Sequence, residues 1–308
     1  MKPSWTAGVT RARLLLSRTI GPEHARAIAG CRSLEEALGA LAGSAYGQRV
    51  PSGADLQSAQ RGVADTLLWH LRIMAGWLPP AGAALVRVLA AWFELFNIDA
   101  RLAALVSDGR EPPPFELGAL ATAWAAVAQA RSLEEVMEAV NASPWGKVDG
   151  GGPAGLAIGL RVAWARRVQS AVPEAERWVM GAAALLVARE VVVVGSRARA
   201  EQLRRLPGIG ERALEAASLP ELRAALGEQA AWALAGIEAP DELWCAELRW
   251  WDQVERDGPE LLRTLSAEAV VAAAAALLAV DAQRTVRALE AAARGGSPEL
   301  VELVGGAD

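Results

Sequence analysis

Four carboxylates near the paired tryptophans at 250–251 are the first residues whose type could do chemistry: Glu247, Asp252, Glu255 and Asp257. Paired carboxylates can serve as general acid and general base. Arg249 and Arg256 lie among them at helical spacing, however, and opposite charges three or four residues apart stabilise an exposed helix. We therefore interpret this cluster as a salt-bridged helix surface, and we expect the same of Glu94 and Asp99.

The segment 206–210, LPGIG, resembles the hairpin of helix-hairpin-helix DNA-binding modules. In such a hairpin the glycine amides face a phosphate at a helix N-terminus. Arg204 and Arg205 precede the segment, which favours this function, but the net charge of −5 does not. The segment also leads directly into a helix start that recurs elsewhere in the chain. We expect a loop between helices, and DNA binding is the third-ranked function.

The stretch 191–198, VVVVGSRA, resembles the first strand and turn of a nucleotide-binding unit. It lacks the G-x-G-x-x-G pattern that lets the backbone approach a pyrophosphate, and no Walker A sequence occurs in the chain. We interpret the valine run as the extension of a preceding helical pattern. The chain should not hydrolyse ATP by itself.

The residues that most often bind metals are few and widely spaced: Cys31, Cys245, His24 and His70. No pair has CxxC or HxxxH spacing, so we expect two reduced core thiols and a packed, hydrogen-bonded His70. We assign no catalytic, cofactor-binding or metal-binding residues. An enzyme is consequently the fourth-ranked interpretation.

The composition describes a folded protein, with 308 residues, 53% apolar and 22% charged. The first thirteen residues, MKPSWTAGVTRAR, lack the apolar core of a signal peptide, which predicts a cytoplasmic location. Two apolar stretches could be mistaken for membrane spans. The stretch 178–195 is interrupted by charged residues, and the stretch 269–280 has only about half the ~20 residues that a span needs. We expect both to be buried helices and the chain not to span a membrane.

Three segments share one helix-start signature, S-x-x-E: Ser33 with Glu36, Ser132 with Glu135, and Ser218 with Glu221. In this capping box the serine hydroxyl accepts one unpaired backbone N–H and the glutamate accepts another. The first two copies also share the preceding arginine. Because any single box is common, the recurrence is the informative observation.

Beyond the cap, the three copies share a pattern of apolar residues. These positions, at i, i+3, i+4 and i+7, are Leu34, Ala37, Leu38 and Leu41, then Leu133, Val136, Met137 and Val140, then Leu219, Leu222 and Leu226. Arg223 takes the remaining place in the third copy, so this helix should be partly solvated. The first two copies end in Ser-x-aromatic-Gly, at 44–47 and 143–146, and Trp232 stands one place later in the third.

These copies predict an all-α protein of three similar helical units, at residues 1–79, 80–172 and 173–308. Breaks such as Pro79-Pro80 separate the copies, and no segment shows the alternation typical of a strand. The spacing of about ninety residues exceeds that of tetratricopeptide or HEAT repeats, which run about 34–47 residues.

The segment WFELFNIDARLAALV, at 92–106, resembles the C/d-subunit family of V-type and A-type ATPases. This family shows an aromatic residue, an acidic residue and Asn-Leu/Ile before a basic, apolar helix, here Phe93, Glu94, Asn97, Ile98 and Arg101. A loop, an S-L-E-E helix and a T/S-P-Y-G exit come next in the family and here. The beginning and end of the chain match in the same order, so the resemblance covers essentially its whole length.

The resemblance implies a funnel of three similar helical subdomains around a pseudo-threefold axis. It also implies a non-catalytic subunit, without cofactors, that couples the rotating central stalk to the membrane proteolipid ring on the cytoplasmic face. Asp281-Ala282-Gln283-Arg284 departs from the family's glutamate and asparagine, and the third unit lacks the aromatic-acidic-Asn pattern. The alternative is a helical adaptor or scaffold that kept the fold without the ATPase.

Overall fold

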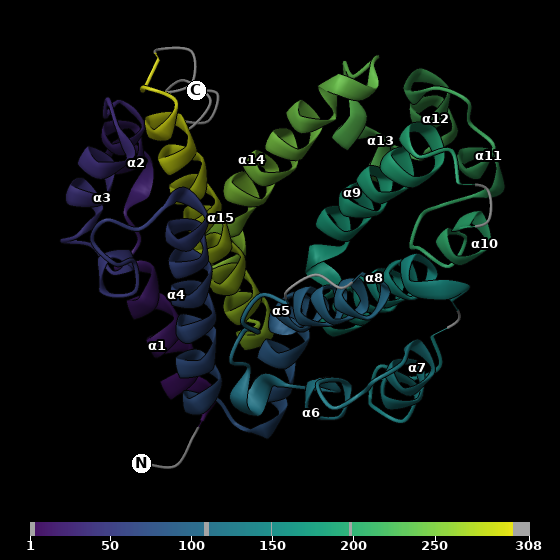
Figure 1. Cartoon of the computed structure of the whole chain (residues 1–308), viewed down its shortest axis with the longest axis horizontal. Coiled ribbons are helices and arrows are strands. Elements are labelled where there is room, and N and C mark those ends of the chain that lie inside the picture. The colour runs from purple at the N-terminus through teal and green to yellow at the C-terminus, as the bar shows by residue number, and fades with distance from the viewer. Residues whose placement is uncertain (1–3, 108–110, 149, 197–198, 298–308) are drawn as a thin grey trace. The chain divides into compact units, whose positions relative to one another are not determined.

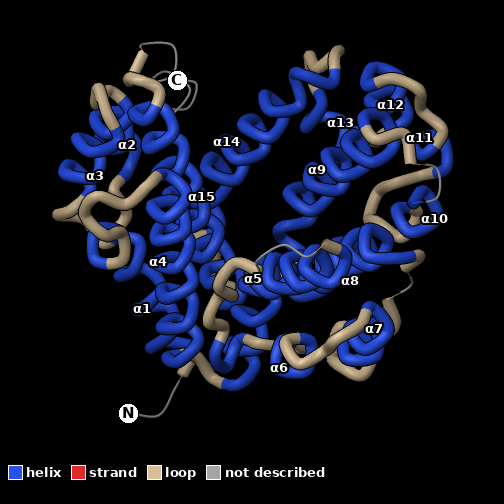
Figure 2. Tube along the Cα trace, in the orientation of Figure 1, coloured by secondary structure: helices blue, strands red, loops and turns tan. Residues whose placement is uncertain are grey.

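The computed structural model describes residues 4–107, 111–148, 150–196 and 199–297, and this part of the chain is helix and loop without a strand (Figures 1 and 2). The prediction of an all-α fold is therefore confirmed. The valine run that resembled a nucleotide-binding strand is helical as well.

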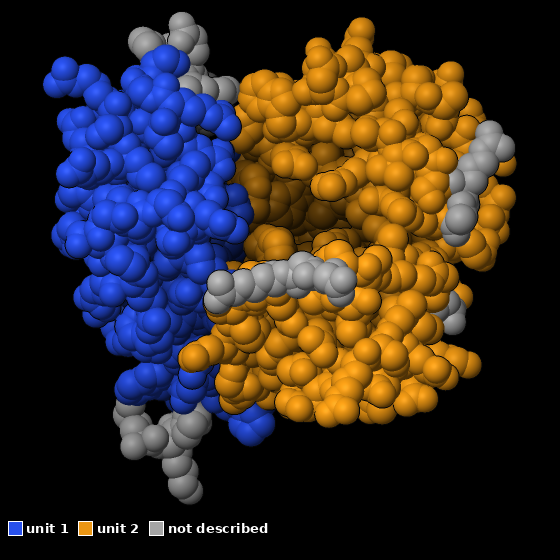
Figure 3. Space-filling model, in the orientation of Figure 1, with its two compact units in different colours: residues 1–86, 254–308 blue, residues 87–253 orange. Residues whose placement is uncertain are grey.

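The chain forms two compact units (Figure 3). Unit 1 combines residues 1–86 with 254–308, and unit 2 comprises residues 87–253. The beginning of the chain thus folds together with its end. The division into three similar subdomains remains a prediction.

Unit 1 contains four helices from the beginning of the chain and one from its end, besides the first residues of α5 and the last of α14. They are α1 (Trp5–Leu16), α2 (Gly21–Ala29), α3 (Leu34–Leu41), α4 (Leu56–Trp77) and α15 (Ala267–Ala293), with the 3-10 turn η1 (Tyr46–Gln48). The predicted break at Pro79-Pro80 is confirmed, because α4 ends at Trp77 and α5 (Pro80–Val106) begins at Pro80.

Helix α15 forms the centre of unit 1. It packs against α1, α2, α3 and α4, and Figure 1 shows it running beside α4. The four consecutive alanines from Ala272 to Ala275 are all buried, which lets neighbouring helices approach closely on several sides. A helix that is apolar on nearly every face is stable only inside a protein core or a membrane.

Unit 2 contains the longer middle part of the chain. Its elements are most of α5, η2 (Gly118–Leu120), α6 (Trp124–Val127), α7 (Leu133–Asn141), α8 (Gly152–Ala171), η3 (Pro173–Ala175), α9 (Glu176–Val187), the π-helix η4 (Ala188–Val193), α10 (Ala200–Leu203), α11 (Glu211–Leu214), α12 (Leu219–Ala225), α13 (Glu228–Ala231), η6 (Trp232–Leu234), η7 (Pro240–Glu242) and most of α14 (Leu243–Leu261).

Helix α8 contributes to two apolar cores in unit 2. Leu156 and Leu160 pack in a core with residues of α5, α6 and α7. Ile158 and Val162, on another face of the same helix, pack in a core with residues of α9 through α13. Because α8 contributes to both cores, it fixes the two halves of unit 2 to each other.

All three predicted helix starts are capped as expected. The Oγ atoms of Ser33, Ser132 and Ser218 accept hydrogen bonds from the backbone nitrogens three residues later, at 3.2, 3.2 and 3.3 Å. The glutamates complete each box by accepting from backbone nitrogens that precede the serines, at 2.6 to 2.9 Å. The third helix is partly solvated as predicted, because Arg223 is half-buried.

The exits of α3 and α7 have the same hydrogen-bond pattern. Ser44 Oγ donates to the carbonyl of Leu41 at 2.7 Å and accepts from Tyr46 N at 3.2 Å. Ser143 Oγ donates to the carbonyl of Val140 at 2.6 Å and accepts from Trp145 N at 3.1 Å. Each turn therefore directs its aromatic side chain into the core.

Each aromatic side chain then donates a hydrogen bond to a buried carboxylate on a long helix. Tyr46 Oη lies 2.8 Å from Asp281 Oδ2, and Trp145 Nε1 lies 2.9 Å from Glu94 Oε2. Burial raises the pKa of Tyr46 well above its ordinary value, and the negative charge of Asp281 raises it further. Tyr46 consequently stays protonated and remains a donor.

The same two carboxylates also accept backbone N–H groups at the start of a short helix. Glu94 Oε1 accepts from the nitrogens of Thr122, Ala123 and Trp124, each at 2.7 Å. Asp281 accepts from the nitrogens of Ile20 and Gly21 at 3.1 and 2.9 Å. We call these two residues the carboxylate anchors, since each binds the start of one short helix and the exit of the next.

Glu94 is fully buried, so the expectation that it lies on a salt-bridged helix surface is wrong. Its acceptor positions are filled by backbone and indole N–H groups, which stabilise a carboxylate inside a core. Asp99 does behave as expected, forming an ion pair with Arg161 at 2.6 Å. Asn97, three residues after Glu94, accepts from Phe115 N at 2.7 Å and donates to its carbonyl at 3.0 Å.

Two helices have the length and hydropathy of a membrane span, α5 and α15. In α5, 56% of the most apolar 18-residue segment is buried inside the protein, and in α15 the share is 72%, as expected for core helices. The stretch 269–280 thus belongs to a longer helix than its apolar residues alone indicated, and its prediction as a buried helix is confirmed. The stretch 178–195 forms α9 and η4, most of whose side chains are buried or half-buried.

His70 on α4 is packed in unit 1 with 2% of its surface exposed. Its Nε2 atom is buried and has no hydrogen-bond partner among the described residues, which differs from the expected hydrogen-bonded histidine. Burial lowers the pKa of His70 to about 4, and the positive charges of Arg18, Arg11 and Arg49 contribute. The imidazole is therefore neutral at pH 7.

The carboxylate anchors predict large losses of stability from isosteric substitution. Glu94→Gln and Asp281→Asn each place an amide NH₂ against N–H donors, so we expect the unfolding free energy to fall by about 3 kcal/mol. Asp99→Asn, on the same helix as Glu94, is the control and should cost about 1 kcal/mol or less. Denaturant unfolding measures all three. Equal effects of Glu94→Gln and Asp99→Asn would contradict the role of the anchor.

His70 predicts a loss of stability in acid. Its folded pKa lies below the unfolded value of about 6.5, so its contribution is complete above pH 6.5 and is lost as the pH falls to about 4. We expect about 2–3 kcal/mol over that window. Unfolding measured in phosphate-free and sulfate-free buffer should show this slope in the natural chain and in His24→Gln. A His70→Gln variant with the same slope would refute the prediction.

Candidate partner-binding site

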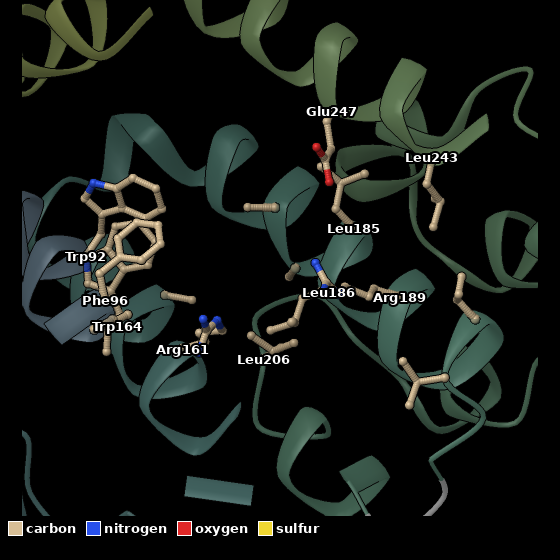
Figure 4. Close-up of a pocket in the computed structure, with 16 residues that line it drawn as sticks. Trp92, Phe96, Arg161, Trp164, Leu185, Leu186, Arg189, Leu206, Leu243 and Glu247 are labelled. Carbon is tan, nitrogen blue, oxygen red and sulfur yellow. The ribbon is translucent and has the colours of Figure 1, made fainter. Parts of the chain in front are cut away.

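Unit 2 contains a hollow of about 640 Å³ lined by four helices, the π-helix η4 and two loop residues. Figure 3 shows it as a depression in the orange unit, and Figure 4 shows the side chains around it. Most of its lining is apolar. Every lining residue lies between positions 92 and 247, so the hollow belongs to unit 2 alone.

One wall of the hollow is aromatic. Trp92 and Phe96 of α5 lie edge to face with ring centroids 4.4 Å apart, and Trp164 of α8 lies beside them (Figure 4). The indole nitrogen of Trp164 donates to the carbonyl of Val88 at 2.8 Å, so its polar group is satisfied while its ring borders the hollow. Phe96 remains 44% exposed. Rigid aromatic rings with little rotamer freedom are common anchors at protein interfaces.

A second wall is formed by the end of α9 and by η4. Leu185 and Leu186 of α9 face the hollow, and they are followed by Arg189 and by Val193 and Val194, which are 47% and 51% exposed. Val194 N donates to the carbonyl of Arg189, five residues earlier, at 2.9 Å. This bond closes a π-turn, a geometry that is rare and found frequently at functional sites.

The π-turn places an acidic residue inside and two valines outside. Glu190 has 6% of its surface exposed and forms an ion pair with Arg199, while its carbonyl accepts from Ser196 N at 3.0 Å. A buried carboxylate is tolerated when a cation and hydrogen bonds compensate it. The ion pair is thus part of the same turn that places Val193 and Val194 at the hollow.

The charges at the hollow are few. Arg161 is held by Asp99 and by the carbonyl of Ala157 at 3.0 Å, so it contributes little net charge. Arg189 and Glu247 are exposed and carry opposite signs. Such a site can receive the apolar side chains of a partner and surround them with a polar rim, as protein interfaces do.

The exposed large apolar residues of unit 2 concentrate at this site. In the described part of the unit they are Phe96, Val106, Val193, Val194 and Trp244. Three of them line the hollow, and Trp244 follows the lining residue Leu243 in sequence. Grouped exposed apolar residues mark interaction sites, whereas single ones are ordinary.

The structure separates the carboxylates of the acidic cluster. Glu247 lines the hollow, whereas Glu255 forms an ion pair with Arg284 in unit 1. Arg249 donates to the carbonyl of Ala233 at 3.2 Å. The ion pair of Glu255 thus joins α14 to α15, and of the four carboxylates Glu247 is the one that lines the hollow in the described part of the chain.

The LPGIG segment forms a loop between α10 and α11, as expected. Gly208 has a φ of +73°, the left-handed region that favours glycine. Leu206 and Ile209 are buried in the core of unit 2, and Leu206 also reaches the hollow. The two cysteines are free, with Cys31 buried and Cys245 half-buried.

Comparison of this chain with models of protein families finds no match, and comparison with curated proteins finds no similar sequence. The function must therefore be argued from the hollow and from the sequence motifs.

The ion pair at η4 predicts a local effect on the hollow. Arg199→Gln leaves the Glu190 carboxylate without its cation, so we expect a cost of about 2–4 kcal/mol. Backbone amide hydrogen exchange should accelerate at residues 190–194 and stay unchanged in α7, which packs in the other core of unit 2. Arg212→Gln, an exposed control in the same unit, should leave both segments unchanged. Protection that is retained at residues 190–194 would contradict this role.

Proposed function

We propose that this chain is a non-catalytic coupling subunit whose unit 2 receives the end of a helical partner. The observation that carries the proposal is the apolar hollow, with an aromatic wall on α5 and exposed valines on η4. A hollow of this composition suits apolar side chains that project from the end of a helix. It contains no paired groups arranged for proton transfer, and its charged side chains are two arginines and one glutamate.

The sequence resemblance supplies the identity of the partner. The residues that resemble the V-type and A-type ATPase C/d-subunit family include Phe93, Glu94 and Asn97, which are buried on α5, the helix that also carries the aromatic wall of the hollow. In our proposal the hollow receives the rotating central stalk. Another face of the protein rests on the proteolipid ring, at the cytoplasmic side of the membrane. The three helical units then form the funnel that the resemblance implies.

The internal construction supports a mechanical role. A coupling subunit must transmit torque without local unfolding, which favours helices held by buried networks over helices held by surface contacts. Glu94 receives four hydrogen bonds within the core of unit 2, and α8 contributes to both of its apolar cores. These features resist shear between neighbouring helices.

A second candidate is a helical adaptor that binds a different helical protein through the same hollow. The departure at 281–284 favours it, since this segment stands where the resembling family usually has a glutamate and an asparagine, and its Arg284 forms an ion pair with Glu255. A changed network at this position is compatible with an altered partner. The two candidates share the hollow and differ in what occupies it.

Substitutions in the hollow test the proposal directly. Phe96→Asp and Val194→Asp place a charge at apolar positions that line the hollow, so both should weaken stalk binding about tenfold or more, and Val194→Asp should change stability little. Val106→Asp is the matched control, since Val106 is 71% exposed in the same unit and does not line the hollow. Binding to purified V/A-type stalk subunits can be measured by calorimetry, with ATPase activity expected to be absent from the isolated chain.

Recovery of the tagged chain from its own organism separates the candidates. ATPase subunits in the recovered complex, lost with Val194→Asp and kept with Val106→Asp, support the coupling subunit. Reproducible recovery of another complex without any ATPase subunit would reject it and support the adaptor.

A further inference from the structure

Several buried nitrogen atoms of unit 1 have no hydrogen-bond partner among the described residues, and two of them lie on neighbouring helices. His70 Nε2 on α4 and Arg11 Nε on α1 are both shielded from solvent and unbonded. Helices α1 and α4 pack against each other, so the two atoms belong to one helix pair. A buried polar group without a partner in a native protein calls for an explanation, and a bound ion or water is the commonest one.

Three arginines lie on, or follow, elements that pack against the helix of this histidine. Arg11 lies on α1, Arg18 follows the end of α1, and Arg49 follows η1, which also packs against α4. The guanidinium of Arg49 lies 5.6 Å from the ring of Trp69, and that ring lies 5.3 Å from the imidazole of His70. The guanidinium of Arg11 lies 6.0 Å from the ring of Trp77.

The electrostatic environment of His70 is positive. Arg18, Arg11 and Arg49 are the charged groups that perturb the imidazole, and each one disfavours its protonation. Among the residues that the structure describes, the named causes of this perturbation include no carboxylate, although the chain as a whole is acidic. Three like charges around a neutral ring are costly unless an anion compensates them.

We propose that His70, Arg11, Arg18 and Arg49 form a binding site for a phosphate group. The neutral imidazole donates through its Nε2–H tautomer, and the guanidinium groups donate charge-assisted hydrogen bonds to the phosphate oxygens. The aromatic rings of Trp69 and Trp77 hold Arg49 and Arg11 in place through cation–π contacts. The phosphate is either free in solution or part of a phospholipid headgroup.

The histidine ring provides a direct readout, because the chain has only two histidines. We expect inorganic phosphate, added at constant ionic strength, to shift the ¹⁵N imidazole signals of His70 with saturation. His24 is exposed and serves as the internal control, whose signals should not change. Equal shifts of both residues, or none, would show that a water alone occupies the site and would overturn the proposal.

Two exposed arginines provide variants that should fold. Arg18→Gln and Arg49→Gln should each weaken phosphate binding about tenfold, the effect of losing one charge-assisted hydrogen bond. Arg32→Gln, an exposed substitution in the same unit, should leave the affinity unchanged. Equal weakening by Arg32→Gln would reveal nonspecific attraction and overturn the site.

Vesicles distinguish the source of the phosphate. Phosphatidylcholine vesicles with phosphatidic acid added should cosediment with the natural chain, and inorganic phosphate should compete, if the headgroup is the ligand. Saturable shifts of His70 without cosedimentation assign the site to free phosphate. Cosedimentation that Arg18→Gln and Arg49→Gln leave unchanged, together with no shift of His70, would reject both. None of these outcomes depends on the stalk or on the hollow of unit 2.

Discussion

The structure depends above all on a carboxylate that is removed from water and bound by N–H groups. Glu94 and Asp281 each join the start of one short helix to the aromatic exit of the next. Helices as short as α6 are marginal in isolation, because the few hydrogen bonds that they form do not offset the free energy of nucleation. The buried acceptor supplies the missing stabilisation, and it does so only when the long helix, both short helices and the aromatic side chain are all in place. Local and tertiary structure thereby become one cooperative unit.

The anchor on α5 also positions the aromatic wall of the hollow. Glu94 lies between Trp92 and Phe96 in sequence, and a displacement of two residues along a helix is about 200° of rotation. When Glu94 points into the core towards α6, its neighbours at 92 and 96 must therefore point towards the opposite side, where they line the hollow. The rotation of α5 is fixed by the hydrogen bonds of Glu94 and Asn97, which a partner at the hollow would not need to supply. Such preorganisation reduces the entropic cost of binding.

Sequence patterns within a few residues predicted the features that depend on neighbouring residues alone. The three capping boxes, the aromatic exits and the all-α fold follow from residues only a few positions apart, and the structure confirms them. The burial of Glu94 could not be predicted this way, since its donors lie near residue 123 and its spacing from Asp99 resembles an ordinary surface pattern. The hollow was missed for the same reason, because five helical elements and two loops contribute to it. Its only local signal was the density of aromatic residues in the segment 92–96.

In the third copy of the repeated helix, at residues 218–232, the aromatic residue at the exit bonds within its own turn and not to a carboxylate anchor. Trp232 donates to the carbonyl of Gln229, at 3.0 Å, within its own turn, and a buried acid of the same unit, Glu190, is compensated by Arg199. An ion pair restrains a helix end less strictly than several backbone hydrogen bonds do. The Glu190–Arg199 ion pair lies at the π-turn, which carries the exposed valines. The two walls of the hollow are thus held by separate networks with no shared residue. Substitutions in the two networks should therefore have additive effects on whatever the hollow binds, because the two networks share no residue.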